Sequence, residues 1–325
     1  MSRMIATGAY AARNIDLIID TDPGVDDVVA LLLALASPQE LSIRALTTVA
    51  GNVPLEKTSR NARLAREWAG CEDVPVYAGA KKPMMRDPIY AEHIHGMEGL
   101  SGVPVYEPMK GLAEGNAIDY LIDILMAARP HSITIAMLGP QTNLALALIR
   151  EPGIVQGIKE VVVMGGAHLN GGNITPLAEF NLFADPQAAE VVLKSGVKLT
   201  YLSLDVTHRM LTSDARLGKI AALNNNASKL VVDILNDCIK ADMEHYGIPG
   251  GPVHDATVIA YLLKPELFSG RQVNVVVDCS EGPAFGQTVV DGGDGLGAPE
   301  NAFWVENGDA EGFFELLTER LARLK

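Results

Sequence analysis

Four aspartates, Asp20, Asp22, Asp26 and Asp27, lie within eight residues, between an apolar run and an apolar helical pattern. Carboxylates this close repel one another unless a cation lies among them. Oxygen ligands of this kind suit Ca²⁺ or Mg²⁺ rather than Zn²⁺. The spacing therefore predicts a site for a hard cation and metal-assisted chemistry.

The local geometry of this segment separates the roles of its last two aspartates. Pro23 and Gly24 predict a turn, and a helix then begins near Val25, which places Asp26 and Asp27 in its first turn. The helix dipole favours acidic side chains there. Adjacent residues leave a helix about 100° apart, so one carboxylate can bind a metal while its neighbour contacts a substrate hydroxyl.

The spacing of the aspartates permits two other interpretations. A calcium-binding EF-hand loop starting at Asp20 is excluded, because its twelfth position, Leu31, carries no carboxylate and Pro23 and Gly24 break the required order. The pattern also resembles phosphatases of the haloacid dehalogenase type, in which Asp20 would be the nucleophile. The chain offers no persuasive phosphate-binding Lys or later acidic pair for that chemistry, but the alternative stays open.

The composition of the chain limits the classes of partner that it can bind. At 325 residues and 48% hydrophobic content the chain can bury one large core. With 26 basic and 40 acidic residues, its net charge of −14 disfavours nucleic acid and anionic membranes as partners, and the longest apolar run, residues 28–36, is too short to span a bilayer. The three cysteines lack a CxxC pair, which favours reduced thiols and a cytoplasmic location.

Short β-rich runs alternate with amphipathic stretches along the chain. This order predicts an α/β fold: a single large domain over residues 15–325 with a mostly parallel open sheet, flanking helices and a Rossmann-like core, after a flexible extension over residues 1–14. Predicted strands are residues 15–20, 41–49, 74–77, 132–138, 160–164 and 197–202; predicted helices begin at residue 25, span 55–68 and 117–128, and follow 142. The C-terminal part is predicted as a helix over 225–246, strands from 272, 288 and 302 at the sheet edge, and a helix after 309.

Polar clusters follow several of these strands, and two long aperiodic stretches, residues 79–115 and 165–185, are predicted to be functional loops. Because ligands bind at the carboxyl ends of parallel strands, we expect the clusters to form one site. The amides and acid of Asn173, Glu179 and Asn181 can hydrogen-bond several hydroxyls of a sugar. Asp255 can face a metal while His254, a proton donor near neutral pH, faces a ligand.

Together these motifs resemble the ordered motif set of the inosine–uridine-preferring nucleoside hydrolases from about residue 15 to the C-terminus. The segments that carry the resemblance are residues 20–27 (DTDPGVDD), 47–52 (TTVAGN), 139–143 (GPQTN), 164–166 (MGG), 178–181 (AEFN) with 185–186 (DP), and 254–255 (HD). Gln141, Glu98 and Ala256 depart from residues common in that family, but none of these departures removes an expected ligand.

The resemblance implies a calcium-dependent hydrolase that releases base and ribose from ribonucleosides, with the nucleoside hydrolase fold and a homodimeric or homotetrameric assembly. It implies Ca²⁺ bound by Asp22, Asp27, Asp255 and the carbonyl of Leu138. It also implies substrate contacts from the remaining site residues, with His95 and His254 on the base side: Asp26, Asn52, His95, Met164, Asn173, Glu179, Phe180, Asn181 and His254.

In the implied mechanism, Asp22 is the general base for a calcium-bound water that attacks the anomeric carbon, and His254 assists departure of the base without a covalent intermediate. A calcium-dependent ribose or nucleoside binding protein without catalysis is a further alternative. The presence of both Asp22 and His254 argues against it.

Overall fold

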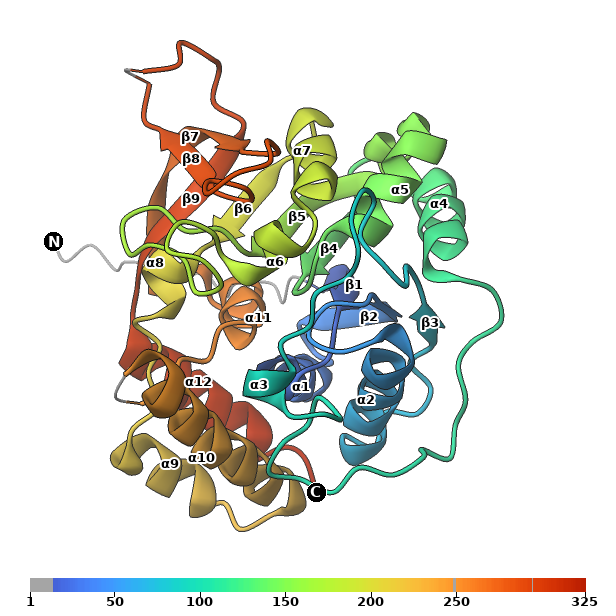
Figure 1. Ribbon diagram of the computed structural model, residues 1–325. Helices are drawn as coiled ribbons and strands as arrows, with labels where there is room; N and C mark the ends of the chain where they lie inside the picture. The colour runs from blue at the N-terminus through green and yellow to red at the C-terminus, as the bar shows by residue number, and fades with distance from the viewer. Residues whose placement is uncertain (1–13, 248–249, 294) are drawn as a thin grey trace, which may run out of the picture.

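The computed structural model describes residues 14–247, 250–293 and 295–325, apart from the side chains at positions 241, 242, 245 and 246. Nearly all of the predicted extension over residues 1–14 lies outside this range. Within it, the order of elements follows the predicted alternation of strands and helices (Figure 1).

The described residues form one mixed sheet of nine strands in the order β3-β2-β1-β4-β5-β6-β9-β7-β8. In this order the strands at one end of the sheet, from β3 as far as β9, run parallel to one another. The last two strands, β7 and β8, are antiparallel to their neighbours. This confirms the predicted α/β class and the predicted C-terminal extension of the sheet edge. The strands, in sheet order, are Val76–Ala78, Leu41–Thr48, Ile15–Thr21, Ile133–Met137, Ile158–Met164, Leu199–Leu202, Ala302–Gly308, Phe268–Val277 and Thr288–Asp291.

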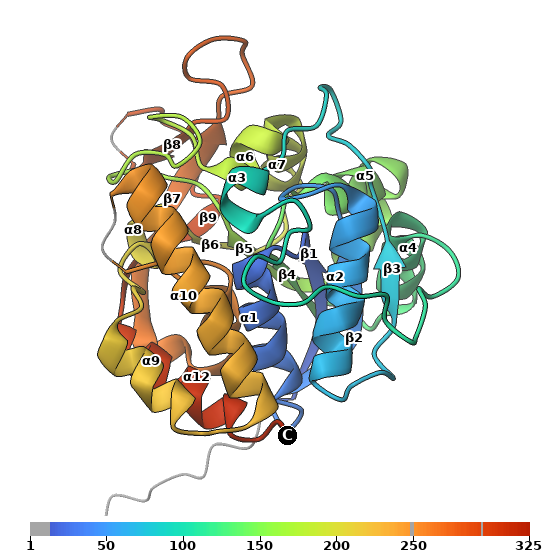
Figure 2. The same ribbon diagram turned by 60° about the horizontal axis from the view of Figure 1, so that its bottom comes forward.

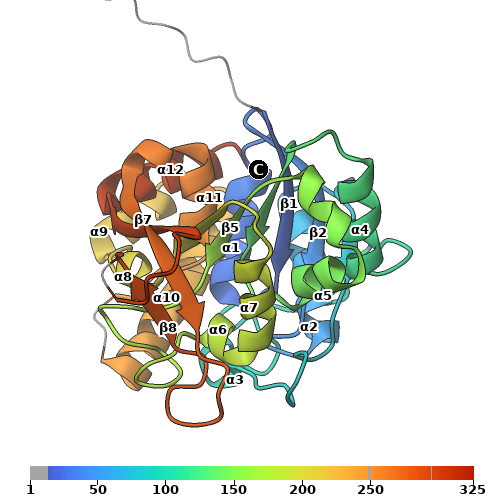
Figure 3. The same cartoon turned by 90° about the horizontal axis from the view of Figure 1, so that it is seen from above.

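Helices cover both faces of the sheet, as Figure 3 shows for α11 and α12 on one side and α4 and α5 on the other. The α-helices α1 to α12 are Val25–Leu35, Leu55–Trp68, Glu92–His95, Ala117–Ala127, Thr142–Arg150, Phe180–Ala184, Pro186–Lys194, Leu204–Thr207, Asp214–Ala221, Asn226–Tyr246, Ala256–Leu263 and Ala310–Leu321. Two 3-10 helices, Pro152–Gly157 and Pro265–Leu267, complete the set.

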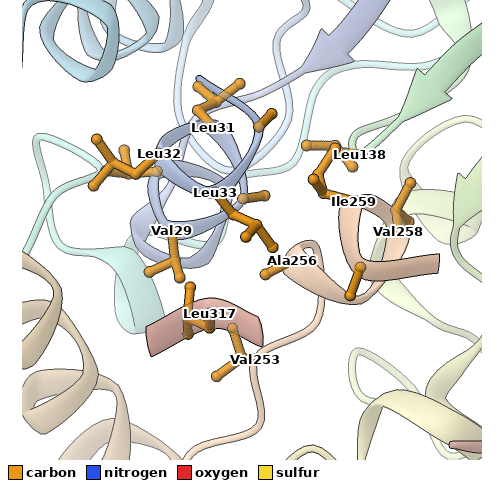
Figure 4. Close-up of a cluster of buried hydrophobic side chains, with 14 of the residues drawn as sticks. Val29, Leu31, Leu32, Leu33, Leu138, Val253, Ala256, Val258, Ile259 and Leu317 are labelled. Carbon is orange, nitrogen blue, oxygen red and sulfur yellow. The ribbon is translucent and has the colours of Figure 1, made fainter. Parts of the chain in front are cut away.

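Helix α1 is the central buried element, since every one of its residues is buried. Its side chains Val29 and Leu33 point toward Ala256 of α11 and Leu317 of α12 (Figure 4). Burial of an aliphatic side chain stabilises the fold by about 1.5–3 kcal/mol. This packing on all sides fixes α1, and so fixes its acidic first turn at the carboxyl end of β1.

Two short helices interrupt the stretches that were predicted as loops. Helices α3 and α6 lie beside each other at the carboxyl end of the sheet (Figures 2 and 3), where Ala91, Phe180 and Ala184 pack together. The prediction missed them because a single helical turn is too short to show a periodic pattern.

Candidate active site

The carboxyl ends of β1, β2, β4 and β5 meet at a cavity of about 380 Å³. All of the predicted site residues line this cavity except Asp22 and Asp27. Asp22 directly follows β1, and Asp27 lies beside the lining residue Asp26 in the first turn of α1. The expected convergence of the polar clusters is therefore observed. The cavity is also lined by residues that the sequence analysis did not single out: Val25, Ala91, His93, Ile94, Asn170, Gly172, Ile174, His208, Cys238 and Pro252.

A cluster of buried carboxylates forms the acidic side of this cavity. Carboxylate oxygens of Asp26, Asp27 and Asp255 lie within 4.8 Å of one another. Asp22 is close enough for its charge to raise the pKa of Asp255. Among the described residues this cluster could hold a metal ion, and its all-oxygen donor set suits a hard cation.

Asp27 is held in place by the turn that precedes α1. The hydroxyl of Thr21 donates to its Oδ1 at 2.5 Å, and the Gly24 N–H and the Asn52 side-chain amide donate to its Oδ2 at 3.0 Å each. Asp27 thus caps its own helix from the third position, because Gly24 has no side chain to do so. These bonds orient its carboxylate before any ligand binds.

Asp22 has one oxygen bound and one left open. The Asn52 N–H donates to its Oδ2 at 2.7 Å, whereas its buried Oδ1 has no hydrogen-bond partner among the residues that the structure describes. A Cβ at Gly51 would lie 2.0 Å from Oδ2, and one at Gly139 would lie 2.3 Å from Oδ1, so both glycines are needed for space. A buried carboxylate oxygen without a partner is costly, which indicates a ligand at this position.

The electrostatics of the cluster agree with a missing positive charge. Burial, and then repulsion from Asp27, raises the pKa of Asp22 well above its usual range. Burial, followed by repulsion from Asp26, raises the pKa of Asp255 in the same way. Burial also raises the pKa values of Asp26 and Asp27. Buried carboxyl groups this close to one another therefore favour the protonated form, and a divalent cation would displace those protons.

Asp20 is separate from this cluster and is not among the residues that line the cavity. The Thr47 hydroxyl and the Asn143 amide donate to its Oδ2 at 2.6 and 2.8 Å. Burial raises the pKa of Asp20 to about 7. Asp20 therefore ties β1 to β2 and to α5, the helix that follows β4, which contradicts the nucleophile role of the phosphatase alternative.

The loop after β5 brings amides and a carboxylate to the opposite wall. Glu179 accepts from the backbone N–H groups of Gly166, Asn181 and Leu182 at 2.8–3.1 Å, and burial raises its pKa to about 7. The Asn173 side chain accepts from the Phe180 N–H at 2.9 Å. These bonds hold the loop in a single shape around the cavity.

Asn181 links this loop to the neighbouring strands. Its side-chain amide donates to the carbonyl oxygens of Leu138 at 2.7 Å and Met164 at 3.3 Å. A carbonyl oxygen has two lone pairs, so Leu138 retains one after this bond.

Two histidines line the cavity from other elements, the buried His95 and the half-buried His254. His95 accepts the Val25 N–H at Nδ1 over 3.1 Å, so it supplies a cap for the first turn of α1. The Nδ1 atom of His254 lies 2.7 Å from the Thr207 hydroxyl. Burial lowers the pKa of His95 to about 4 and that of His254 to about 3, so both rings are neutral at pH 7.

The fold and this site define the class: an α/β protein with an acidic cavity at the strand ends, whose carboxylates could hold a cation. The model of the inosine-uridine preferring nucleoside hydrolases matches residues 17–315. The pyrimidine-specific ribonucleoside hydrolase RihB of Escherichia coli is 41% identical over 304 residues, covering 93% of this chain and 96% of its own. An uncharacterized protein of Schizosaccharomyces pombe is 44% identical over 308 residues, covering 95% and 99%.

Among solved structures, a purine-preferring ribonucleoside hydrolase from Gardnerella vaginalis superposes with a TM-score of 0.87 at 30% identity, covering 94% of this chain and 98% of its own. The chain belongs to the inosine-uridine preferring nucleoside hydrolase family, as its motifs predicted. Its enzyme class is that of the nucleoside N-ribohydrolases, and the phosphatase alternative is wrong. Within the described ranges no helix is both long and apolar enough to cross a membrane.

Proposed function

We propose that the protein is a calcium-dependent hydrolase of pyrimidine ribonucleosides, with Ca²⁺ bound by Asp22, Asp27, Asp255 and the Leu138 carbonyl. The observation that carries the metal assignment is the unpartnered, buried Oδ1 of Asp22 beside a cluster of carboxylates. The preference for pyrimidines rests on the 41% identity to a pyrimidine-specific relative.

The hydrogen bonds of the site support the division of labour between Asp22 and Asp26. Burial raises the pKa of Asp26, and nearby backbone N–H groups, its own first and then that of Asp255, oppose that rise. Asp22 retains an open oxygen. We therefore assign Asp22 to the cation and Asp26 to a ribose hydroxyl, although Asp26 lies within the cluster.

When bound, Ca²⁺ supplies positive charge that keeps the carboxylates ionised and makes a nearby water a stronger nucleophile. Asp22 accepts the proton of the attacking water. The other carboxylates stabilise the positive charge that develops on the sugar as its bond to the base breaks.

The remaining lining residues bind and orient the substrate. Asn52, Asn173, Glu179 and Asn181, with Asp26, present acceptors and donors to the ribose hydroxyls, and Met164 and Phe180 border the sugar. His95 and His254 lie on the base side, where His254 assists departure of the base. A cytoplasmic homodimer or homotetramer remains part of the proposal, supported by the family resemblance and by the cysteine pattern.

A reducing-sugar assay tests this function. Uridine, cytidine, inosine, adenosine and uridine 5′-phosphate are each incubated with the protein, with chelator and with added Ca²⁺. We expect ribose release from uridine and cytidine ahead of the purine nucleosides, loss of release with chelator, and recovery with Ca²⁺. Activity that survives exhaustive chelation contradicts the metal role, and faster release from inosine contradicts the pyrimidine preference.

A further inference from the structure

Thr207, the last residue of α8, is fully buried. Within the part of the chain that the structure describes, its hydroxyl makes a single hydrogen bond, to Nδ1 of His254 at 2.7 Å. Helix α8 directly follows β6, so its last residue lies at the same end of the sheet as the carboxylate cluster. No motif in the sequence pointed to this residue.

Backbone pairing between two distant segments fixes this contact. The Val253 N–H donates to the Met210 carbonyl at 3.1 Å, and the Thr212 N–H donates to the Gly251 carbonyl at 3.0 Å. Leu211 forms an antiparallel bridge with Pro252, which lies between Gly251 and Val253. This short ladder sets the register of the segment that contains Thr207 against the segment that contains His254.

The neighbouring ring limits the orientation of the imidazole. His208 lies edge-on to His254, with ring centroids 5.5 Å apart. Because the Thr207 hydroxyl is bonded to Nδ1 of His254, and His254 lines the cavity, Nε2 is the ring nitrogen left available to a ligand.

The direction of the hydrogen bond between Thr207 and His254 follows from the acceptors that the Thr207 hydroxyl can reach. The Thr207 hydroxyl is buried and has no other acceptor among the described residues, so its hydrogen is satisfied only if it donates to Nδ1. The ring proton then resides on Nε2. The opposite arrangement, with Nδ1–H donating to Thr207, would bury an unsatisfied hydroxyl hydrogen.

We propose that Thr207 is a positioning residue for hydrolysis, which acts by holding His254 in the tautomer whose Nε2–H is directed at the leaving base. This inference rests on the proposed ribohydrolase function. The base departs with the electron pair of the N-glycosidic bond, and the Nε2–H hydrogen bond stabilises the charge that develops on it. The base later takes its proton from solvent, so no further reactant is needed.

The test compares two leaving groups in variants of the calcium-loaded enzyme. Uridine needs assistance at its base, whereas p-nitrophenyl β-D-ribofuranoside releases a phenolate that leaves without it. Thr207→Val removes the hydroxyl at nearly constant volume and Thr207→Ser retains it. Thr212→Val is the matched control, because its hydroxyl donates to the Gly251 carbonyl and does not contact the His254 ring.

We expect Thr207→Val to lower kcat for uridine by about 10- to 100-fold, since positioned proton donors contribute rate factors of this order or larger. With p-nitrophenyl riboside kcat should change by less than about threefold, because transition-state stabilisation at the sugar is intact. Thr207→Ser and Thr212→Val should stay within the same range on both substrates. If the valine variant does not fold, Thr207→Ala against Thr207→Ser makes the same comparison.

Two results overturn the inference: uridine turnover in the valine or alanine variant close to that of the parent enzyme, or an equal loss on both substrates, which marks a purely structural role. A parent enzyme that cleaves p-nitrophenyl riboside but not uridine overturns this inference while the ribohydrolase function stands. A parent enzyme that cleaves neither substrate overturns the proposed function and this inference with it.

Discussion

Calcium binding should release protons from the carboxylate cluster of Asp26, Asp27 and Asp255. Their oxygens lie within 4.8 Å of one another. Two unit charges at about 4.8 Å repel by about 3.5 kcal/mol at an effective dielectric constant of about 20. Burial raises the pKa of each carboxyl, and repulsion from neighbours adds to the rise for Asp27 and Asp255. The carboxyl groups of the cluster therefore hold their protons more tightly than free carboxyl groups do, and Ca²⁺ binding must displace those protons.

Isothermal titration calorimetry in buffers of different protonation enthalpy measures this release. Between pH 5 and pH 6 we expect net proton release on Ca²⁺ binding and an affinity that strengthens as the pH rises, by about tenfold per pH unit for each proton displaced. Asp255→Asn should reduce the proton count. Asp185→Asn should leave it unchanged, because Asp185 is buried and caps α7 outside the cluster. Proton release near zero over this range would refute the electrostatic reasoning.

Three further predictions concern the roles and ionisation of the buried acids. Asp22→Ala should lower ribose release by about 10³-fold or more with an unchanged melting temperature, as removal of a general base does; near-normal kcat would contradict the mechanism. Asp20→Asn should retain uridine turnover within about tenfold, because Asp20 does not line the cavity; complete loss in a folded variant would show that we have misplaced it. In chelator, the melting temperature should fall between pH 6.5 and pH 7.5, because burial raises the pKa values of Glu179 and Asp20 to about 7 and the folded protein keeps protons that the unfolded chain has lost. Below pH 6.5 the lowered pKa values of His95 and His254 act in the opposite direction. A melting temperature that rises between pH 6.5 and pH 7.5 in differential scanning calorimetry would contradict the sign of the shifts of Glu179 and Asp20.

The sequence predicted most of the sheet and most of the cavity lining for the same reason. Apolar runs followed by Asp, Asn or Gly mark strands that end at a polar site, and the parallel order brings those ends together. Residues 55–68 were predicted as a helix with the bounds that the structure gives. The first turn of α1 was equally evident from Pro23 and Gly24.

What the sequence could not predict depends on contacts between distant segments. Helices α3 and α6 have one turn each, so no period is visible. The contact between Thr207 and His254 joins residues 47 positions apart and depends on backbone pairing between their two segments, which leaves no local pattern. The orientation of Asp20 away from the cavity is set by Thr47 and Asn143, each from a different part of the chain.

The central claim is that this protein cleaves the N-glycosidic bond of a ribonucleoside. The most direct test is a time course of proton NMR spectra of uridine with the calcium-loaded protein. The account predicts that the H1′ signal of uridine disappears while free uracil and ribose appear in equal amounts, and that chelator stops the change. Broadened signals of an intact, bound nucleoside without any product would contradict the claim and identify a binding protein instead.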